Sequence, residues 1–466
     1  MFKRVSNTLP RMCKFISNLL WGSFESKAEI QKFSFLSVIF GFIIGAYWAM
    51  RPIKDSIFHA LVDINYQPLA KTFSLVCIFV LILVYNKLLD TYPRQTVFYL
   101  LAGVYSALAF VFYFAFSHPI YGLDAASPSP YNIIGWVWYV YVESFGSLIV
   151  ALFWAFTTDT TSPESGKRGF PMLALFGQIG NILGPYILNT RMLGIPNSAP
   201  ILLIIGFLMA LIGVLFWVFM QVTPSDQLRS YEGSVGTVEE SHSDPGFFEG
   251  LRLLFTKGYL LGIFAIIGVY EVIVTILDYH LKCSVMATFA TEAEQSAYLS
   301  SYATWTGIIA TACILLGINS IQRRLGMQVS LLLLPVLVAV AVLCTKMYSN
   351  SLEVAFWIMV LAKAINYALN QPTLKQLYIP TTRDTKYKAQ AWIEMFGSRG
   401  AKFLGSQVNM LRGWHFISNY GKTLGVAYFM TAAAGLSFGL IGFWFFVSIY
   451  VAKAYNKAII EDRVVC

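Results

Sequence analysis

The chain has 466 residues, of which 57% are hydrophobic, 16% are aromatic and only 12% are charged. A soluble globular domain carries about 25% charged residues, so this composition excludes an ordinary soluble fold. The formal net charge of +9 does not indicate a nucleic-acid partner, because the basic residues lie in short connections rather than on one amphipathic face.

Apolar residues are grouped in blocks of roughly 18 to 25, the length of helix that crosses about 30 Å of hydrocarbon. The first block begins near Phe33 and lacks a small-residue cleavage site, so we expect an uncleaved transmembrane helix rather than a signal peptide. The chain is therefore predicted to be an all-α polytopic protein of the lipid bilayer. In chain order, twelve transmembrane helices are expected at residues 33–50, 70–89, 96–117, 132–157, 170–190, 199–221, 259–279, 299–318, 328–347, 353–374, 389–410 and 424–451.

The loops differ in their content of basic residues. If the N-terminal tail is cytoplasmic, most of the 33 lysines and arginines fall on the cytoplasmic side, as the positive-inside rule requires. Both termini are therefore predicted to be cytoplasmic. The expected parts are an N-terminal tail (1–32), a six-helix half (33–222), a cytoplasmic linker (223–258), a second six-helix half (259–452) and a C-terminal tail (453–466).

The two predicted halves resemble each other at one place in particular. The segment FTTDTTSPESGKRGFPMLALFGQIGNILG leads into the fifth span, and IPTTRDTKYKAQAWIEMFGSRGAKFLG leads into the eleventh. Each has a threonine-rich loop with an aspartate, then a basic cluster and an FGxxG. Two six-helix repeats are the plan of the major facilitator transporters, whose substrate sites lie near the midplane between the halves. The sequence thus predicts a major-facilitator-like carrier.

Ionisable residues inside the spans are the candidates for a site, because a charge at the bilayer centre costs at least about 2.5 kcal/mol and usually faces a cavity or a partner. Tyr139 lies four residues before the acid of the fourth span, and Asn370 lies seven residues after the lysine of the tenth, so each shares a helix face with that charge. The mid-span charges are Glu143, Glu271, Lys363 and Glu394.

Structural explanations for these charges stay open. Glu143 and Lys363 would neutralise one another if they met across the bundle. Glu394 would be satisfied by Arg399 or Lys402 in the same span. Polar residues that share a helix face with a mid-span charge nevertheless recur on four predicted helices from both halves. This recurrence favours a polar central cavity.

Signatures of soluble enzymes are absent or broken. The GKT at residues 421–423 has Phe416 where a phosphate-binding loop needs glycine, and no HExxH occurs. The six cysteines show no CxxC spacing. Neither an enzyme, a metal site nor a cofactor is predicted.

Four segments carry a more specific pattern. They are RPIKDS after the first span, VESFGSLIVALFWAFTTDTT through the fourth, LFGQIGNILG in the fifth, and LKQLYIPTTRDTKYKAQAWIE from the tenth into the eleventh. Together they resemble the bacterial and plastid nucleotide transporters, the ATP/ADP translocases of obligate intracellular bacteria and plastids. The resemblance covers both halves. It implies a nucleotide antiporter or symporter of the bacterial inner membrane, distinct from mitochondrial carriers.

The resemblance also points to individual residues. By the family's pattern, Lys54 and Glu143 are functional positions, and Asn181 matches an asparagine of the fifth span. Lys375 and Lys388 match two basic positions in the second half of the family's pattern.

This chain departs from the family at two positions. The family has a span-seven glutamate about one turn after Glu271, near Val274 here, and a further lysine near Gln390. Exchange of ATP with ADP is the expected activity. Proton-coupled import of nucleoside triphosphates, transport of another nucleotide such as GTP, or transport of another organic phosphate stays open.

Roles follow from charge. Nucleotide phosphates carry about three to four negative charges and need cations that also release them. We expect phosphate contacts from Lys54, Lys363, Lys375 and Lys388, base or ribose contacts from Tyr139, Asn181 and Asn370, and coupling or ion pairing from Glu143, Glu271 and Glu394. Arg51 and Asp55 are expected to form a pair that holds Lys54.

Overall fold

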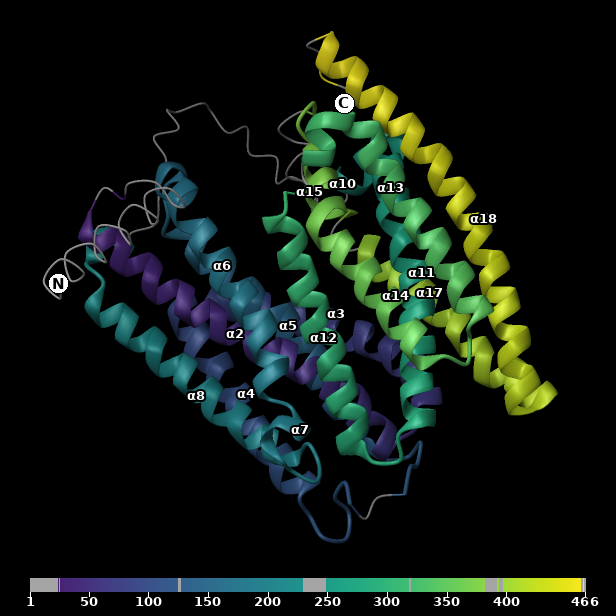
Figure 1. Ribbon diagram of the computed structural model, residues 1–466. Coiled ribbons are helices and arrows are strands. Elements are labelled where there is room, and N and C mark those ends of the chain that lie inside the picture. Colours follow the sequence, from purple (N-terminus) through teal and green to yellow (C-terminus); the bar gives the residue numbers. More distant parts are fainter. Residues whose placement is uncertain are drawn as a thin grey trace, which may run out of the picture. The chain divides into compact units, whose positions relative to one another are not determined.

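A computed structural model describes residues 24, 26–124, 127–228, 249–317, 320–381, 392–393, 397–461 and 464. These residues form helices joined by turns and loops, and no strand occurs among them (Figure 1). The all-α class expected from the composition is confirmed.

The longer elements are all α-helices. In chain order they are α2 (Lys27–Leu61), α3 (Gln67–Thr91), α4 (Arg94–Phe116), α5 (Ile133–Asp159), α6 (Pro163–Ile187), α8 (Ala199–Val222), α10 (Glu249–Thr256), α11 (Gly258–Thr288), α12 (Glu292–Leu315), α13 (Ser320–Met347), α14 (Leu352–Ile365), α17 (Ser398–Leu411) and α18 (Ser418–Ile460).

Short elements fill several connections. The 3₁₀ turn η1 (Ile64–Tyr66) follows α2, α7 (Thr190–Leu193) precedes α8, and α9 (Ser225–Leu228) follows it. The π-helix η2 (Asn366–Asn370) and α15 (Gln371–Gln376) extend α14, and the π-helix η5 (Arg412–Ile417) joins α17 to α18.

Nine helical stretches among the described residues are long and apolar enough to cross a membrane. One of them, Ser398–Ile460, has 63 residues and contains a break at Gly421, where φ is +75°. The helices α6 and α12, with 25 and 24 residues, have spanning length but are more polar. The protein is an integral membrane protein, and the number of twelve spans stays a prediction.

The chain forms two compact units. Unit 1 comprises Met1–Lys54, Ile78–Ala126 and Val140–Glu240, and unit 2 comprises Asp55–Cys77, Ser127–Tyr139 and Ser241–Cys466. One division falls within α2, between Lys54 and Asp55. The helices α2, α3 and α5 are thus each divided between the two units. The predicted boundaries of two six-helix halves are a different partition and stay a prediction.

In unit 1, α2 and α6 cross at glycines. A Cβ added at Gly180 would lie 2.2 Å from the carbonyl oxygen of Gly41, and one added at Gly184 would lie 2.2 Å from that of Gly45. Each helix therefore carries a Gly-xxx-Gly at the contact, which lets two transmembrane backbones approach closely. The glycines of the predicted LFGQIGNILG motif are thus packing residues of the α2–α6 crossing.

The helices α4 and α8 also run side by side in unit 1 (Figure 1). The rings of Phe98 and Phe216 stack with their centroids 4.1 Å apart, and Ser106 Oγ donates to the carbonyl oxygen of Gly206 over 2.8 Å. This pairing fixes α4 as a support for α5.

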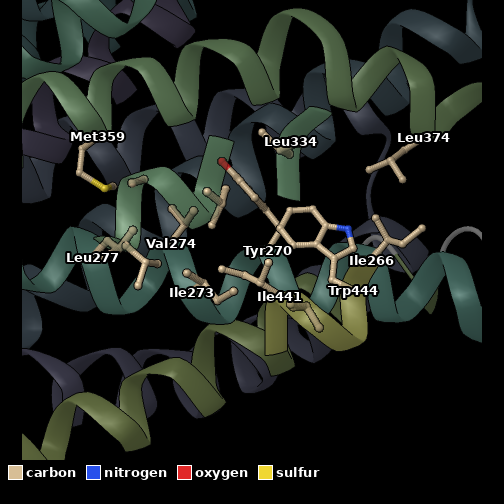
Figure 2. Close-up of a cluster of buried hydrophobic side chains, with 14 of the residues drawn as sticks. Ile266, Tyr270, Ile273, Val274, Leu277, Leu334, Met359, Leu374, Ile441 and Trp444 are labelled. Carbon is tan, nitrogen blue, oxygen red and sulfur yellow. The ribbon is translucent and has the colours of Figure 1, made fainter. Parts of the chain in front are cut away.

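The core of unit 2 surrounds α11. Figure 2 shows Ile266, Tyr270 and Leu277 of α11 among side chains from α13, α14, α15 and α18. The Trp444 side chain is fully buried, and its ring lies 6.2 Å from that of Tyr270, edge to face. Because α11 is apolar on most of its circumference, its few charged residues stand out as exceptions that need partners.

Gly180→Ala is expected to lower the thermal stability of the purified protein. The added Cβ would overlap the Gly41 carbonyl, and overpacking of this kind costs about 1–3 kcal/mol. The matched control is Gly103→Ala in α4, where a Cβ would meet nothing within 4 Å. Unfolding midpoints in detergent measure both, and equal midpoints for the two variants would contradict the proposed close packing.

Candidate functional site

The first charged feature lies in unit 1. Lys54 of α2 donates to Glu143 Oε1 of α5, and the two form an ion pair. The lysine side chain is 5% exposed and the glutamate side chain 30% exposed. A buried ammonium needs such a counter-charge, because desolvation of an unpaired ion costs several kcal/mol. The structure thus brings together two residues that the sequence singled out separately.

The position of Glu143 is fixed by its neighbours on α5. Tyr141 donates to the carbonyl oxygen of Tyr105 over 2.9 Å, and Tyr105 in turn donates to Ser144 Oγ over 2.9 Å. These bonds hold one face of α5 against α4. Glu143 lies on another face, where it meets α2.

The expected pairing of Arg51 with Asp55 is wrong. The Arg51 guanidinium lies over the ring of Trp48, 4.7 Å from its centroid. Asp55 instead pairs with Lys282 of α11 at 2.9 Å. The spacing of four allows the two side chains to meet, but Lys282 supplies the ion-pair partner of Asp55.

A chain of ion pairs, which we name the ion-pair chain, runs through unit 2. Lys282 Nζ lies 2.9 Å from Asp55 Oδ2 and 2.7 Å from Asp278 Oδ2. Asp278 Oδ1 in turn lies 2.5 Å from Lys363 Nζ. The four side chains are between 4% and 16% exposed. Alternation of sign along the chain lets each buried charge keep an opposite neighbour.

Lys363 has an aromatic neighbour as well as a carboxylate. Its Nζ lies 5.0 Å from the centroid of the Tyr302 ring, within the range of a cation–π interaction. Lys363 and Glu143 therefore each have an oppositely charged partner within their own unit, and the structural alternative in which these two neutralise one another is not needed.

The segment after Lys363 departs from α-helical geometry. Residues Asn366–Asn370 form a π-helix, and Pro372 follows at once. Proline lacks the N–H that would bond four residues back, so the helix ladder is disturbed at this point. Such π-bulges are frequent at functional sites.

Two asparagines have buried amide oxygens without a partner among the described residues. They are Asn181 of α6 in unit 1, 8% exposed, and Asn370 of the π-helix in unit 2, 2% exposed. The Asn370 amide nitrogen donates to Asn366 Oδ1 over 2.9 Å. An acceptor left over in this way is suited to a donor such as an amino group of a nucleobase or a ribose hydroxyl.

Other predicted residues lie in different surroundings. Tyr139 is fully buried in unit 2, where its hydroxyl accepts from Gln67 over 3.2 Å and its ring packs on Phe58. Lys375 is exposed in α15. It follows Lys363 by 12 positions, roughly 18 Å along a helix, so the two cannot contact the same phosphate oxygen.

Glu271 pairs with α17 rather than with the ion-pair chain. Its Oε1 accepts from Ser398 Oγ over 3.1 Å, and its Oε2 lies 3.6 Å from Lys402 Nζ. This arrangement ties α11 to α17. The remaining predicted residues, Lys388 and Glu394, lie outside the described residues, and their roles stay predictions.

Two members of the ion-pair chain, Asp278 and Lys282, are not among the site residues predicted from sequence, and Asp55 is predicted only as the partner of Arg51. A signal for Asp278 and Lys282 exists, because Asp278 lies at the end of the expected seventh span (259–279) and Lys282 follows four positions later. An acid and a base at that spacing share a helix face. What the sequence does not show is that Asp55, more than 200 positions earlier, supplies the next carboxylate.

A groove of about 450 Å³ lies between α4 and α8, where it is lined by side chains such as Phe110, Met209 and Trp217. None of its lining residues is charged. The groove is therefore unsuited to a nucleotide and is not part of the charged site.

Comparison with known proteins places the fold. A solved bacterial homolog of the human lysosomal transporter Spinster, in an inward-facing and unoccupied conformation, aligns with 92% of this chain and 99% of its own, with a TM-score of 0.62 and 14% sequence identity. The expected major-facilitator-like class is thus confirmed.

Relatives in sequence extend over nearly the whole chain. The ADP,ATP carrier protein 1 of Rickettsia conorii is 22% identical over 498 residues, covering 95% of each chain. The ADP,ATP carrier protein 1 of Rickettsia prowazekii is 25% identical over 481 residues, covering 92% of this chain and 93% of its own. The profile of the TLC ATP/ADP transporter family matches residues 10–126 and 134–435. This protein therefore belongs to the TLC ATP/ADP transporter family.

Proposed function

We propose that this protein exchanges ATP with ADP, or related nucleoside tri- and diphosphates, across a bacterial inner membrane. The family profile and the ADP,ATP carrier relatives support nucleotides as the transported substrate. The observation that carries the proposal is that three largely buried lysines, Lys54, Lys282 and Lys363, each lie against a carboxylate. The alternating-access scheme of this fold requires no chemical change in the substrate, and we propose no enzymatic activity.

The lysine–carboxylate pairs suit reversible binding of phosphates. An ammonium is a point charge that binds a phosphate oxygen as readily as a carboxylate oxygen. When a nucleotide phosphate replaces the carboxylate, the lysine keeps a counter-charge throughout, so binding and release need no bare buried ion. In this mechanism the carboxylate competes with the substrate and sets how easily it leaves.

Each of the two units contains at least one lysine that is paired with a carboxylate. Unit 1 offers Lys54 with Glu143, and unit 2 offers Lys282 and Lys363 with Asp278. Alternating access in this fold is a rocking of one half against the other around a site near the midplane. We propose that each unit contributes lysines that bind nucleotide phosphates, and that Asn181 and Asn370 accept hydrogen bonds from the base or ribose.

Orientation follows from the basic residues of the loops. Most of the 33 lysines and arginines fall on one side when the helices are threaded in chain order, which supports cytoplasmic termini. The end of α2 at Leu61 would then lie on the outer face, which we name the α2-end face.

Reconstituted protein is expected to take up labelled ATP into liposomes faster when the lumen contains ADP. Exchange requires a counter-substrate, whereas proton-coupled import would respond to a pH gradient with an empty lumen. The measurement is the initial uptake rate with ADP, GDP, a sugar phosphate or buffer inside. If no internal nucleotide accelerates uptake of any nucleotide and no pH gradient drives it, the proposed function is wrong.

Lys54→Gln is expected to reduce nucleotide uptake by about 10- to 100-fold, the loss that follows removal of one charged contact. The matched control is Lys87→Gln, because Lys87 is exposed in α3 and has no proposed role. Uptake per inserted protein, measured by quantitative blotting, separates transport from folding. Equal uptake by both variants would show that Lys54 is only a structural partner of Glu143.

Asp278→Asn is expected to lower both the KM for ATP and kcat by several-fold. The substitution removes the carboxylate that competes with phosphate for Lys282 and Lys363, so the nucleotide binds more tightly and leaves more slowly. Asp90→Asn, an exposed acid at the end of α3, is the control. A raised KM with unchanged kcat would show that Asp278 itself assists nucleotide binding.

A further inference from the structure

One buried cation takes no part in the ion pairs described above. Arg412 begins the π-helix η5 in unit 2 and is only 8% exposed. Its Nε is buried and has no hydrogen-bond partner among the described residues, and no carboxylate of those residues lies within ion-pair distance of its guanidinium. Lys282 and Lys363, also in unit 2, do have carboxylates. Arg412 is therefore an exception to the pairing that holds elsewhere in this unit.

The contacts of Arg412 are aromatic rather than acidic. The guanidinium lies 5.7 Å from the centroid of the Tyr279 ring, and His280 follows Tyr279 directly in α11. His280 Nε2 bonds the carbonyl oxygen of Ser349 at 3.2 Å. Since a carbonyl only accepts, Nε2 carries the proton in the neutral ring, and His280 supplies no counter-charge.

The acid of the neighbouring turn forms no ion pair with Arg412 among the described residues. Asp63, after the end of α2, accepts from the backbone N–H of Asn65 over 2.7 Å and holds the η1 turn. Cation–π stabilisation by one tyrosine is smaller than the cost of desolvating a guanidinium. The Arg412 guanidinium therefore has a buried Nε without a hydrogen-bond partner and no carboxylate within ion-pair distance among the described residues.

The cover over this site comes from the turn between α2 and α3. Tyr279 donates to the carbonyl oxygen of Ile64 over 3.4 Å, and a Cβ on Gly413 would lie 3.9 Å from Asn65. Two further bonds fasten the same region: Ser56 Oγ donates to Glu292 over 2.6 Å and Gln407 donates to Thr72 Oγ1 over 3.0 Å. This turn therefore packs against α11 and beside the start of η5, where Arg412 lies.

We propose that Arg412 is a phosphate-binding residue for substrate arriving from the α2-end face. It is covered while the α2–α3 turn packs on α11, and it is exposed when that turn separates. The planar guanidinium with its several donors binds two oxygens of one phosphate, which a lysine does not do. The proposal rests on the proposed nucleotide transport, to which it adds a residue that acts on one face only.

Transport from the two faces tests the proposal. Arg412→Gln is expected to raise the KM for ATP added on the α2-end face about tenfold and to leave the KM on the opposite face unchanged. Arg412→Lys keeps the charge without the bidentate geometry and should give an intermediate KM. Arg324→Gln is the matched control, since Arg324 is exposed at the start of a different helix. An equal change on both faces, or none, would overturn the proposal.

Inhibition by inorganic pyrophosphate identifies the source of the anion. Pyrophosphate on the α2-end face is expected to compete with ATP in the wild type and about tenfold more weakly in Arg412→Gln. If its inhibition is the same in both, and the variant's defect instead follows the anionic lipid content of the vesicles, Arg412 binds a lipid headgroup and the proposal fails.

A wild-type protein that transports no nucleotide would refute the proposed function separately. Binding of pyrophosphate to detergent-purified protein then decides the role of Arg412. Weaker binding by Arg412→Gln, with Arg412→Lys intermediate, supports an anion site. Equal binding by all three proteins, together with a lowered unfolding midpoint of the variant, identifies Arg412 as a structural residue only.

Discussion

A charged side chain within a membrane protein must keep an opposite charge or polar partner, and this requirement organises the polar interior of both units. Lys54 keeps Glu143, and Lys363 keeps Asp278. In the proposed mechanism the two lysines must also meet substrate, so they cannot stay paired with these carboxylates permanently. Pairing by single lysine–carboxylate contacts resolves the conflict, because a phosphate can take the place of the carboxylate without leaving a bare ion.

The boundary between the two units separates two neighbouring charged residues of α2. The α2 helix carries Lys54 in unit 1 and Asp55 in unit 2, so adjacent residues are bound to different partners. Asp55 joins the ion-pair chain through Lys282, and Ser56 bonds Glu292 of α12. Any movement of the α2 end away from α11 must break the Asp55–Lys282 contact. This salt bridge therefore resists the movement that, in our proposal, exposes Arg412.

Close helix packing sets the precision of the site. Gly41, Gly45, Gly180 and Gly184 bring α2 and α6 within backbone contact, which fixes the helix that carries Lys54. In unit 2 the π-helix after α14 shifts the residues that follow Lys363 and leaves the Asn370 amide oxygen unsatisfied. The glycine contact thus holds α2 rigidly against α6, and the π-helix presents the polar Asn370 amide.

Local sequence determined the helical class, the membrane environment and the family, because runs of apolar residues and motifs such as RPIKDS are properties of contiguous chain. It also indicated Lys54, Glu143 and Lys363, since a charge within an apolar run is conspicuous wherever it falls. The ion-pair partners of these residues could not be predicted from local sequence. Asp55 was expected to pair with Arg51 and instead pairs with Lys282, which lies on a helix more than 200 positions later in the chain. Only the tertiary structure decided which carboxylate meets which lysine, and only it shows that Arg412 is buried without one, since burial depends on segments far apart in the chain.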